Sequence, residues 1–137
     1  MQRKAQIVIL EKGSPIPSVL LLKTNRQRGG FWQNVTGSVE DHESFLEGAK
    51  RELWEETGIQ MHSLQELNLS FEFMDRWGRE VEEKVYLGLL DKAPAKIKLQ
   101  AEEHDEYKWL TVDNVSEGQF GHKSNYRALV FALKVLE

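Results

Sequence analysis

Three glutamates, Glu52, Glu55 and Glu56, fall close together in the sequence, within a stretch whose apolar residues follow a helical period. Residues three and four apart are neighbours on an α-helix, so these carboxylates would share one face or its edge. Such crowding is unfavourable unless a cation lies among the side chains, and hard oxygen ligands suit Mg²⁺ or Mn²⁺. Three glutamates alone usually form a solvated helix face, so the interpretation depends on the residues around them.

The segment before the glutamates contains residues that could support a metal site. Gly37 can adopt a backbone conformation that other residues avoid, or allow a ligand to come close. Glu43 lies just before the expected helix, where the helix dipole favours negative charge. Arg51 could bridge to such a carboxylate and hold the loop against the helix.

Together these residues form one spaced pattern: Gly, five residues, Glu, seven residues, Arg-Glu-Leu, one residue, Glu-Glu, one residue, Gly-Ile. This pattern, from Gly37 to Ile59, resembles the Nudix box at every fixed position and covers 23 of the 137 residues. The resemblance implies an α/β/α sandwich around a mixed sheet, and hydrolysis of a nucleoside diphosphate linked to another group. It also implies that Glu52, Glu55 and Glu56 are metal ligands, supported by Arg51 and Glu43.

Hydrolysis of a pyrophosphate link has defined chemical needs. Mg²⁺ neutralises the phosphate oxygens and activates a water molecule, and a carboxylate must accept the proton of that water. Glu55 and Glu56 could do so from the helix, and Glu103 is a third candidate. The sequence does not distinguish among the three.

Two flanking segments, 31–40 and 103–110, and the pair Ser124-Asn125 resemble the dihydroneopterin triphosphate pyrophosphatase branch of the family. The resemblance implies that Thr36 contacts substrate and that Glu103 is an additional metal ligand. The phosphate-binding arginine of that branch falls in the loop 25–28, where Arg26 is our candidate. At His122 the sequence departs from the branch, which has a serine there that contacts substrate.

The tryptophans offer a second kind of contact with substrate. Trp32 lies nearest the box and is our candidate for stacking on a flat ring, whereas core packing is the simpler role for Trp77 and Trp109. For the two histidines, we expect His42 to face solvent in a loop. His104 could orient Glu103, although packing or exposure is the simpler expectation.

The pattern of apolar residues predicts the elements that position these side chains. We expect strands at 5–10, 19–22, 67–74, 81–90 and 107–110, and turns at 13–17 and 75–79. Ser44 and Glu47 form a capping-box pattern and Gly58 a stop, which predicts a helix at about 44–57. Ser124 or Asn125 could cap a last helix with the apolar face Leu129, Val130, Leu133 and Leu136. The expected fold class is α+β, and residues 1–137 are expected to form a single domain.

Composition narrows the function classes. The formal charge of −4 and pI near 5.6 argue against stable nucleic-acid binding, and the absence of cysteine excludes thiolate chemistry. The N-terminus has no long apolar stretch, so we expect no membrane association and a cytoplasmic location. Either a monomer or a homodimer is compatible with the sequence.

These observations favour a Mg²⁺-dependent pyrophosphohydrolase that cleaves a nucleoside or dihydroneopterin triphosphate to the monophosphate and pyrophosphate. An alternative is a Nudix hydrolase acting on 5′-triphosphate RNA, a dinucleoside polyphosphate or a nucleotide sugar. A third hypothesis is a sensor without catalytic activity, which would be expected to have lost box carboxylates; here all are present.

Overall fold

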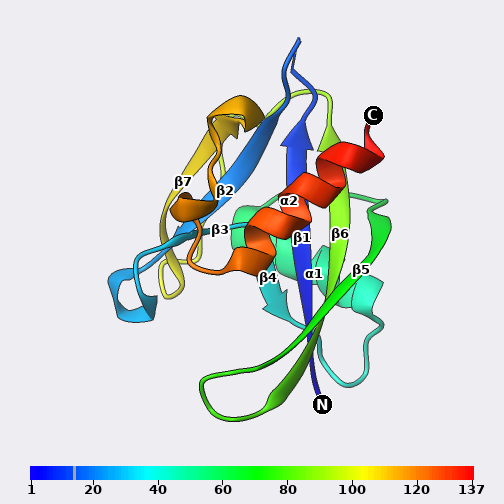
Figure 1. The fold of residues 1–137 in the computed structure, drawn as a ribbon, viewed down its shortest axis with the longest axis vertical. Coiled ribbons are helices and arrows are strands. Elements are labelled where there is room, and N and C mark those ends of the chain that lie inside the picture. The colour runs from blue at the N-terminus through cyan, green and yellow to red at the C-terminus, as the bar shows by residue number, and fades with distance from the viewer. Residues whose placement is uncertain (14) are drawn as a thin grey trace.

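A seven-stranded mixed sheet lies between two helices, α1 (Phe45–Thr57) and α2 (Lys123–Val135) (Figure 1). The computed structural model describes residues 1–13 and 15–137. Ser14, inside the turn expected at 13–17, lies outside the described residues. The α+β class and the α/β/α layering expected from the sequence are confirmed.

The strands take the path β3-β2-β1-β6-β5, with β4 pairing to β1 and β7 to β2. In the described part of the chain, three 3₁₀ helices lie in connecting segments: Arg26–Arg28 (η1), Val112–Asn114 (η2) and Glu117–Gln119 (η3). The strand bounds are Gln2–Glu11 (β1), Ser18–Thr24 (β2), Trp32–Gln33 (β3), Val35–Ser38 (β4), Gln65–Met74 (β5), Glu80–Leu90 (β6) and His104–Thr111 (β7).

Strand β1 is the centre of the sheet, and its pairing explains why the sheet divides on one side. It runs parallel to β6 along its whole length. On its other edge it pairs antiparallel with β4 at residues 4–7, then with β2 at residues 10–11. The sheet therefore forks beside β1, and the residues at 24–34 lie in the fork.

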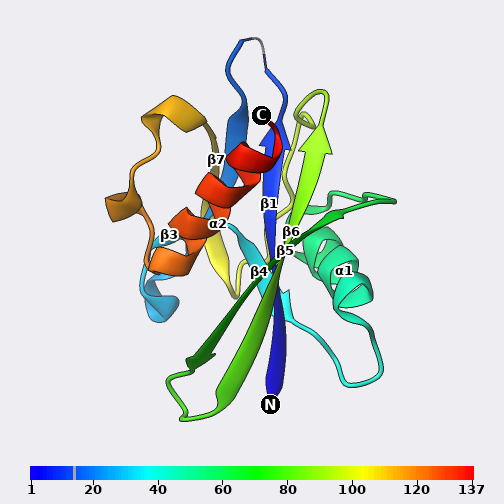
Figure 2. The ribbon, with the colours of Figure 1, turned by 45° about the vertical axis from the view of Figure 1, so that its right-hand side comes forward.

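Alternation along β1 produces two separate hydrophobic cores, because successive side chains point to opposite faces of a sheet. Ile7 and Ile9 pack in the core that includes Leu53 of α1. Val8 and Leu10 pack in the core that includes Leu129 of α2. Figure 2 shows the two helices on opposite sides of the sheet.

Helix α1 begins and ends as its sequence predicts. Ser44 accepts a hydrogen bond from the Glu47 amide, and the Glu47 side chain accepts one from the Ser44 amide. Gly58 closes the helix with φ of 78°, a conformation that favours glycine. These caps fix where the glutamates of α1 lie along the helix.

The prediction for the last helix was wrong in its start and only partly right in its face, since Leu129 and Leu133 pack in the α2-side core but Leu136 does not. His122, rather than Ser124 or Asn125, is the N-cap residue of α2, and it makes no side-chain cap. Asn125 is instead buried, and it lies on the helix face that also carries Ala128, Leu129 and Ala132. The expected Leu136 is 40% exposed. Within the described residues, neither helix is long and apolar enough to cross a membrane.

Candidate functional site

Gly37 of β4 lies against the first residue of the glutamate cluster. A Cβ atom at position 37 would overlap the Glu52 carboxyl group. Glycine is therefore required here because the backbone and the Glu52 side chain approach closely, rather than because of an unusual backbone angle. The close approach joins the end of β4 to the middle of α1.

Arg51 links the loop before α1 to the carboxylates of the helix. Its guanidinium donates to Glu43 through Nη2–Oε1 at 2.6 Å and Nε–Oε2 at 3.0 Å. It also donates to Glu52 at 3.1 Å, to Glu55 at 2.8 Å and to the Ser38 carbonyl at 2.9 Å. The expected bridge between Arg51 and Glu43 is confirmed. The Arg51 hydrogen bond lowers the pKa of Glu43 to about 2, so this loop carboxylate stays ionised.

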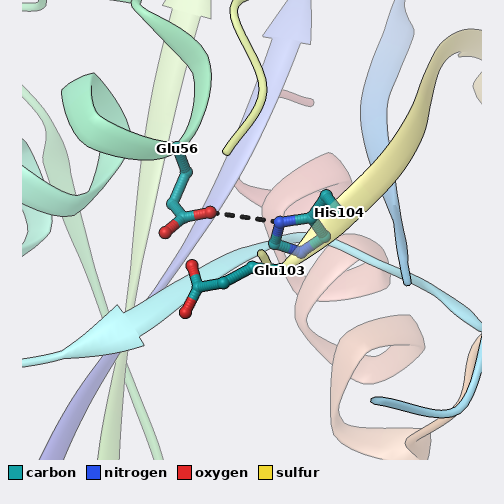
Figure 3. A group of neighbouring side chains, drawn as sticks. All are labelled: Glu56, Glu103 and His104. Atoms are coloured by element: carbon teal, nitrogen blue, oxygen red, sulfur yellow. Dashed lines mark hydrogen bonds and ion pairs between the residues drawn. The ribbon is translucent and has the colours of Figure 1, made fainter. Parts of the chain in front are cut away.

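Glu56 is oriented by a histidine from another part of the chain. His104, at the start of β7, is buried, and its Nδ1 lies 3.1 Å from Glu56 Oε2 (Figure 3). Its Nε2 lies 2.8 Å from the Gln33 amide nitrogen, which can only donate. Nε2 therefore accepts, Nδ1 carries the proton, and His104 donates to Glu56. Burial lowers the pKa of His104, consistent with this neutral form.

Glu103 joins the cluster from the loop before β7. Ligand atoms of Glu56, Glu103 and His104 all lie within 4.8 Å of one another. Burial raises the pKa of Glu56, and the hydrogen bond with Glu103 raises it further. That same hydrogen bond and the ion pair with Arg28, at 2.8 Å, lower the pKa of Glu103. Glu103 is thus the partner that keeps its charge.

The donor set suits a hard divalent cation. Burial raises the pKa of Glu52 to about 7, and nearby Glu56 and Glu55 add to the rise, whereas Arg51 acts against it. Carboxylates that take up protons in this way exchange them for Mg²⁺ or Mn²⁺, whose preferred ligands are oxygen atoms. His104 is fully engaged through both ring nitrogens, so its role is to orient Glu56 rather than to bind the ion.

A cavity of about 650 Å³ opens on the α2 side of the sheet, next to this cluster. Two of its wall residues also touch the cluster: Arg28 pairs with Glu103, and Gln33 hydrogen bonds to His104. The rest of the wall comes from β1, the end of β2 with the loop after it, β4, β6, the end of β5 with its turn, and the start of α2. It includes Lys4, Thr24, Phe31, Thr36, Phe71, Phe73, Trp77, Glu83, His122 and Asn125.

The candidate substrate contacts are placed differently from one another. Thr36 lines the cavity, as expected for a residue that touches substrate. Among the described residues, however, the arginine of the 25–28 loop that lines the cavity is Arg28, and Arg26 does not. Asn25 caps η1 and accepts from the Arg28 amide, so the short turn decides which arginine faces inward.

Trp32 and Trp77 have exchanged the roles expected from the sequence. Trp32 packs in the α2-side core with the Lys108 ammonium 4.2 Å from its ring, and it is not among the described residues that line the cavity. Trp77, expected in the core, is 65% exposed at the β5–β6 turn and lines the cavity. Among the residues not singled out for these roles from sequence are Arg28, Gln33, Glu83 and His104. Arg28, in the loop expected to hold a phosphate-binding arginine, and His104, beside Glu103 in the chain, gave some sequence indication.

A mixed sheet between two helices carries a carboxylate cluster beside a cavity, and this set of oxygen ligands could hold a divalent metal. Residues 1–130 match the family model for the NUDIX domain, so the chain belongs to the Nudix family. Nudix hydrolases generally need a divalent metal, and the carboxylate cluster is a possible site for one.

Solved structures agree with this assignment. The chain is similar to the E. coli dihydroneopterin triphosphate pyrophosphohydrolase, with 26% identity and a TM-score of 0.79 over 93% of this chain and 91% of that one. It resembles in fold the C. elegans Ap4A hydrolase (22% identity, TM-score 0.78, 98% and 99% covered). The NUDIX domain of Shewanella oneidensis NrtR, solved with ADP-ribose, is a further structural neighbour (18% identity, TM-score 0.81, 98% and 88% covered).

A curated relative matches over part of its length. It is an octanoyltransferase from Myxococcus xanthus, 31% identical over 116 residues, which are 84% of this chain and 32% of that protein. The chain thus spans about a third of the length of the curated relative it matches.

Proposed function

We propose that this protein hydrolyses a nucleoside or pterin triphosphate to the monophosphate and pyrophosphate, with Mg²⁺ as the metal. The observation that carries the proposal is the shared wall between the cavity and the carboxylate cluster, at Arg28 and Gln33. A ring bound in the cavity would extend its phosphates past Arg28 toward Glu103 and Glu56. We also propose that residues 1–137 act as one Nudix domain.

In this proposal the metal is held by Glu52, Glu55, Glu56 and Glu103. A divalent cation there supplies charge neutralisation of the phosphates and activation of water. Arg51 holds Glu52 and Glu55 in place from the side of the loop. Thr36, on the cavity wall, would donate to a phosphate or sugar oxygen.

We assign Glu56 as the residue that accepts the proton of the attacking water. Burial and the hydrogen bond with Glu103 raise its pKa to about 9, so Glu56 would accept this proton only when a bound cation has displaced its own. His104 donates to Oε2 at 3.1 Å and so fixes the orientation of this carboxyl group. Glu103, held by Arg28, would remain an ionised ligand.

Because one structural neighbour is an Ap4A hydrolase and another was solved with ADP-ribose, the test must distinguish triphosphates from these other substrate classes. The purified protein with Mg²⁺ is offered dGTP, dATP and dihydroneopterin triphosphate, alongside diadenosine tetraphosphate, ADP-ribose and a 5′-triphosphate oligonucleotide. We expect pyrophosphate and a monophosphate from at least one small triphosphate, at the highest kcat/KM of the panel.

Hydrolysis in ¹⁸O-labelled water identifies the phosphorus that is attacked. The label is incorporated into whichever product, the monophosphate or the pyrophosphate, contains that phosphorus. The Glu56→Gln protein serves as the control for contaminating phosphatases. Faster cleavage of a dinucleoside polyphosphate, nucleotide sugar or oligonucleotide would replace the triphosphate proposal. Absence of pyrophosphate release from every triphosphate would refute it.

A further inference from the structure

A buried carboxylate lies in the wall of the cavity, away from the metal cluster. Glu83 of β6 is only 5% exposed, yet it lines the cavity. It is on the same face of its strand as Val85 and Leu87, which pack in the α2-side core. Lys4, Gln6 and Val8 of β1 alternate along the strand and therefore lie on this same face. The face thus changes from apolar side chains to polar ones near the start of α2.

Hydrogen bonds around Glu83 have a fixed direction. The Asn34 amide nitrogen Nδ2 donates to the Asn125 carbonyl at 3.1 Å and to Gln6 Oε1 at 2.7 Å. Because Gln6 Oε1 accepts, the amino group of Gln6 faces Glu83, and its Nε2 donates to Glu83 Oε1 at 2.9 Å. All four side chains are buried. The network therefore makes Glu83 an acceptor and fixes its position.

The second oxygen of Glu83 is available to a ligand. Within the described residues, no hydrogen bond reaches Glu83 Oε2, and this atom is not among the buried polar atoms that lack a partner. It is therefore open to the cavity. An ionised carboxylate has about four lone-pair positions, so Oε1 can also accept a second donor.

Aromatic side chains line the same cavity as this carboxylate. Phe71 of β5 lies directly opposite Glu83 in the strand pairing, and Phe73 lines the same cavity two residues further along. Trp77 at the turn lies under two guanidinium groups, with Arg76 at 4.5 Å and Arg79 at 5.1 Å from its ring centre. Flat walls beside a fixed acceptor suit a planar ring whose edge carries N–H groups.

We propose that Glu83 recognises the ring of the substrate by accepting two adjacent N–H donors, as on the 2-amino-4-oxopyrimidine edge that guanine and pterin share. The inference rests on the proposed function and specifies the substrate class. Burial raises the pKa of Glu83, while the Gln6 hydrogen bond and the Lys4 charge oppose that rise. Two further N–H donors from the ring act in the same direction as Gln6 and keep the carboxylate ionised.

The same geometry excludes other rings. Adenine presents a ring nitrogen acceptor beside its amino group, and this acceptor would face the Glu83 carboxylate without a proton between them. Hypoxanthine keeps the ring N–H but lacks the 2-amino group, so it can satisfy only one oxygen. A correctly paired two-point contact discriminates against the wrong base by roughly 5- to 150-fold.

The test measures binding of the monophosphates dGMP, dIMP and dAMP to the intact protein by calorimetry. Because it requires no turnover, it can succeed even where the proposed reaction fails. We expect dGMP to bind at least about tenfold more tightly than dAMP, with dIMP between them. Equal affinities for dGMP and dAMP would overturn the assignment of Glu83.

Three variants locate the preference. Glu83→Gln replaces one acceptor oxygen by a donor, so dGMP binding should weaken about tenfold and dAMP binding should be unchanged or improved. Glu83→Asp keeps the charge but withdraws the oxygens, so it should weaken dGMP binding without favouring dAMP. It also provides the test if the glutamine variant does not fold.

Glu82→Gln makes the same change on the opposite face of β6 and should leave the dGMP-to-dAMP ratio unchanged. A ratio that stays within about twofold of the parent in both Glu83 variants would refute the proposal.

Discussion

The metal cluster and the ring cavity are built from the chain in opposite ways. Three of the four carboxylates assigned to the metal lie on one turn and a half of α1, and the fourth comes from the loop before β7. The cavity takes its wall from at least five elements and loops, and the contact between Asn34 and Asn125 spans 91 residues of sequence. Reaction chemistry is therefore encoded locally, and recognition of the ring is encoded by distant parts of the chain.

The contrast has a practical consequence for variants. Changes in the cluster should lower kcat or the affinity for metal, whereas changes in the cavity should raise KM and alter the choice of ring. Arg28 and Gln33 belong to both regions, so they are poor positions for separating the two effects.

The largest effect is expected for Glu56→Gln. The substitution keeps the size of the side chain but removes the proton acceptor and a metal ligand, so kcat should fall by about 10²- to 10⁴-fold. Binding of the monophosphate product in the cavity should change little. Glu47→Gln is the matched control on the same helix, because glutamine also completes a capping box. A Glu56→Gln protein with near-parental kcat would contradict the role of this residue.

A smaller effect, on metal affinity, is expected for His104→Ala. The variant loses the donor that holds Glu56 Oε2 at 3.1 Å, and loss of such a supporting contact weakens metal binding by about tenfold to a hundredfold. Titration of activity with Mg²⁺ measures the shift, and high Mg²⁺ should restore most of kcat. His42→Ala, in an exposed loop, should leave the titration unchanged. An unchanged Mg²⁺ dependence in His104→Ala would show that His104 does not support the site.

Trp77→Ala tests the other side of the comparison. Removal of the exposed ring from the cavity rim should raise KM by about fivefold while kcat stays within about twofold. Stacking of a base on a ring contributes about 1–3 kcal/mol, and a largely exposed ring is expected at the low end of that range. Trp54→Ala removes a ring that is 58% exposed on α1 and serves as the control. An equal rise of KM in both variants would mean that Trp77 has no specific contact with substrate.

The smallest effect concerns the support of the cluster at low pH. The Arg51 hydrogen bond holds the pKa of Glu43 at about 2 in the folded protein, below the usual 4.5. Glu43 binds its proton more readily in the unfolded chain, so its contribution is complete above about pH 4.5 and is lost as pH falls toward about 2. Urea unfolding at about pH 6 and about pH 3 should show the difference between parent and Glu43→Gln shrinking with acidification. A difference that does not depend on pH would contradict the pairing.

What the sequence could predict follows the same division. Ser44, Glu47 and Gly58 define the ends of α1 through contacts within a few residues, so the position of its glutamates was predictable. Arg26 and Arg28 lie in one polar loop, and only the 3₁₀ turn capped by Asn25 determines which of them lines the cavity. No local pattern contains that information.

Long-range contacts account for the other errors. Asn125 resembles a helix cap in sequence. Its side-chain oxygen instead accepts a hydrogen bond from the backbone amide of Asn34, and the helix starts before it. Trp32 is next to the box in the chain yet packs against the α2-side core. Trp77 lies in the turn that joins the paired strands β5 and β6, and this pairing places it at the cavity. Position in the sequence is therefore a poor guide to which aromatic residue lines the cavity.

The β5–β6 hairpin, whose far end extends past both helices in Figure 1, offers a route to altered specificity. Its residues Phe73, Met74 and Trp77 line the cavity, are exposed, and contribute nothing to the carboxylate cluster. A mutant library confined to this turn would vary the surface that meets the ring while it preserves the machinery for phosphate chemistry. Laboratory selection could in that way retarget the enzyme to new bases without rebuilding its reaction centre.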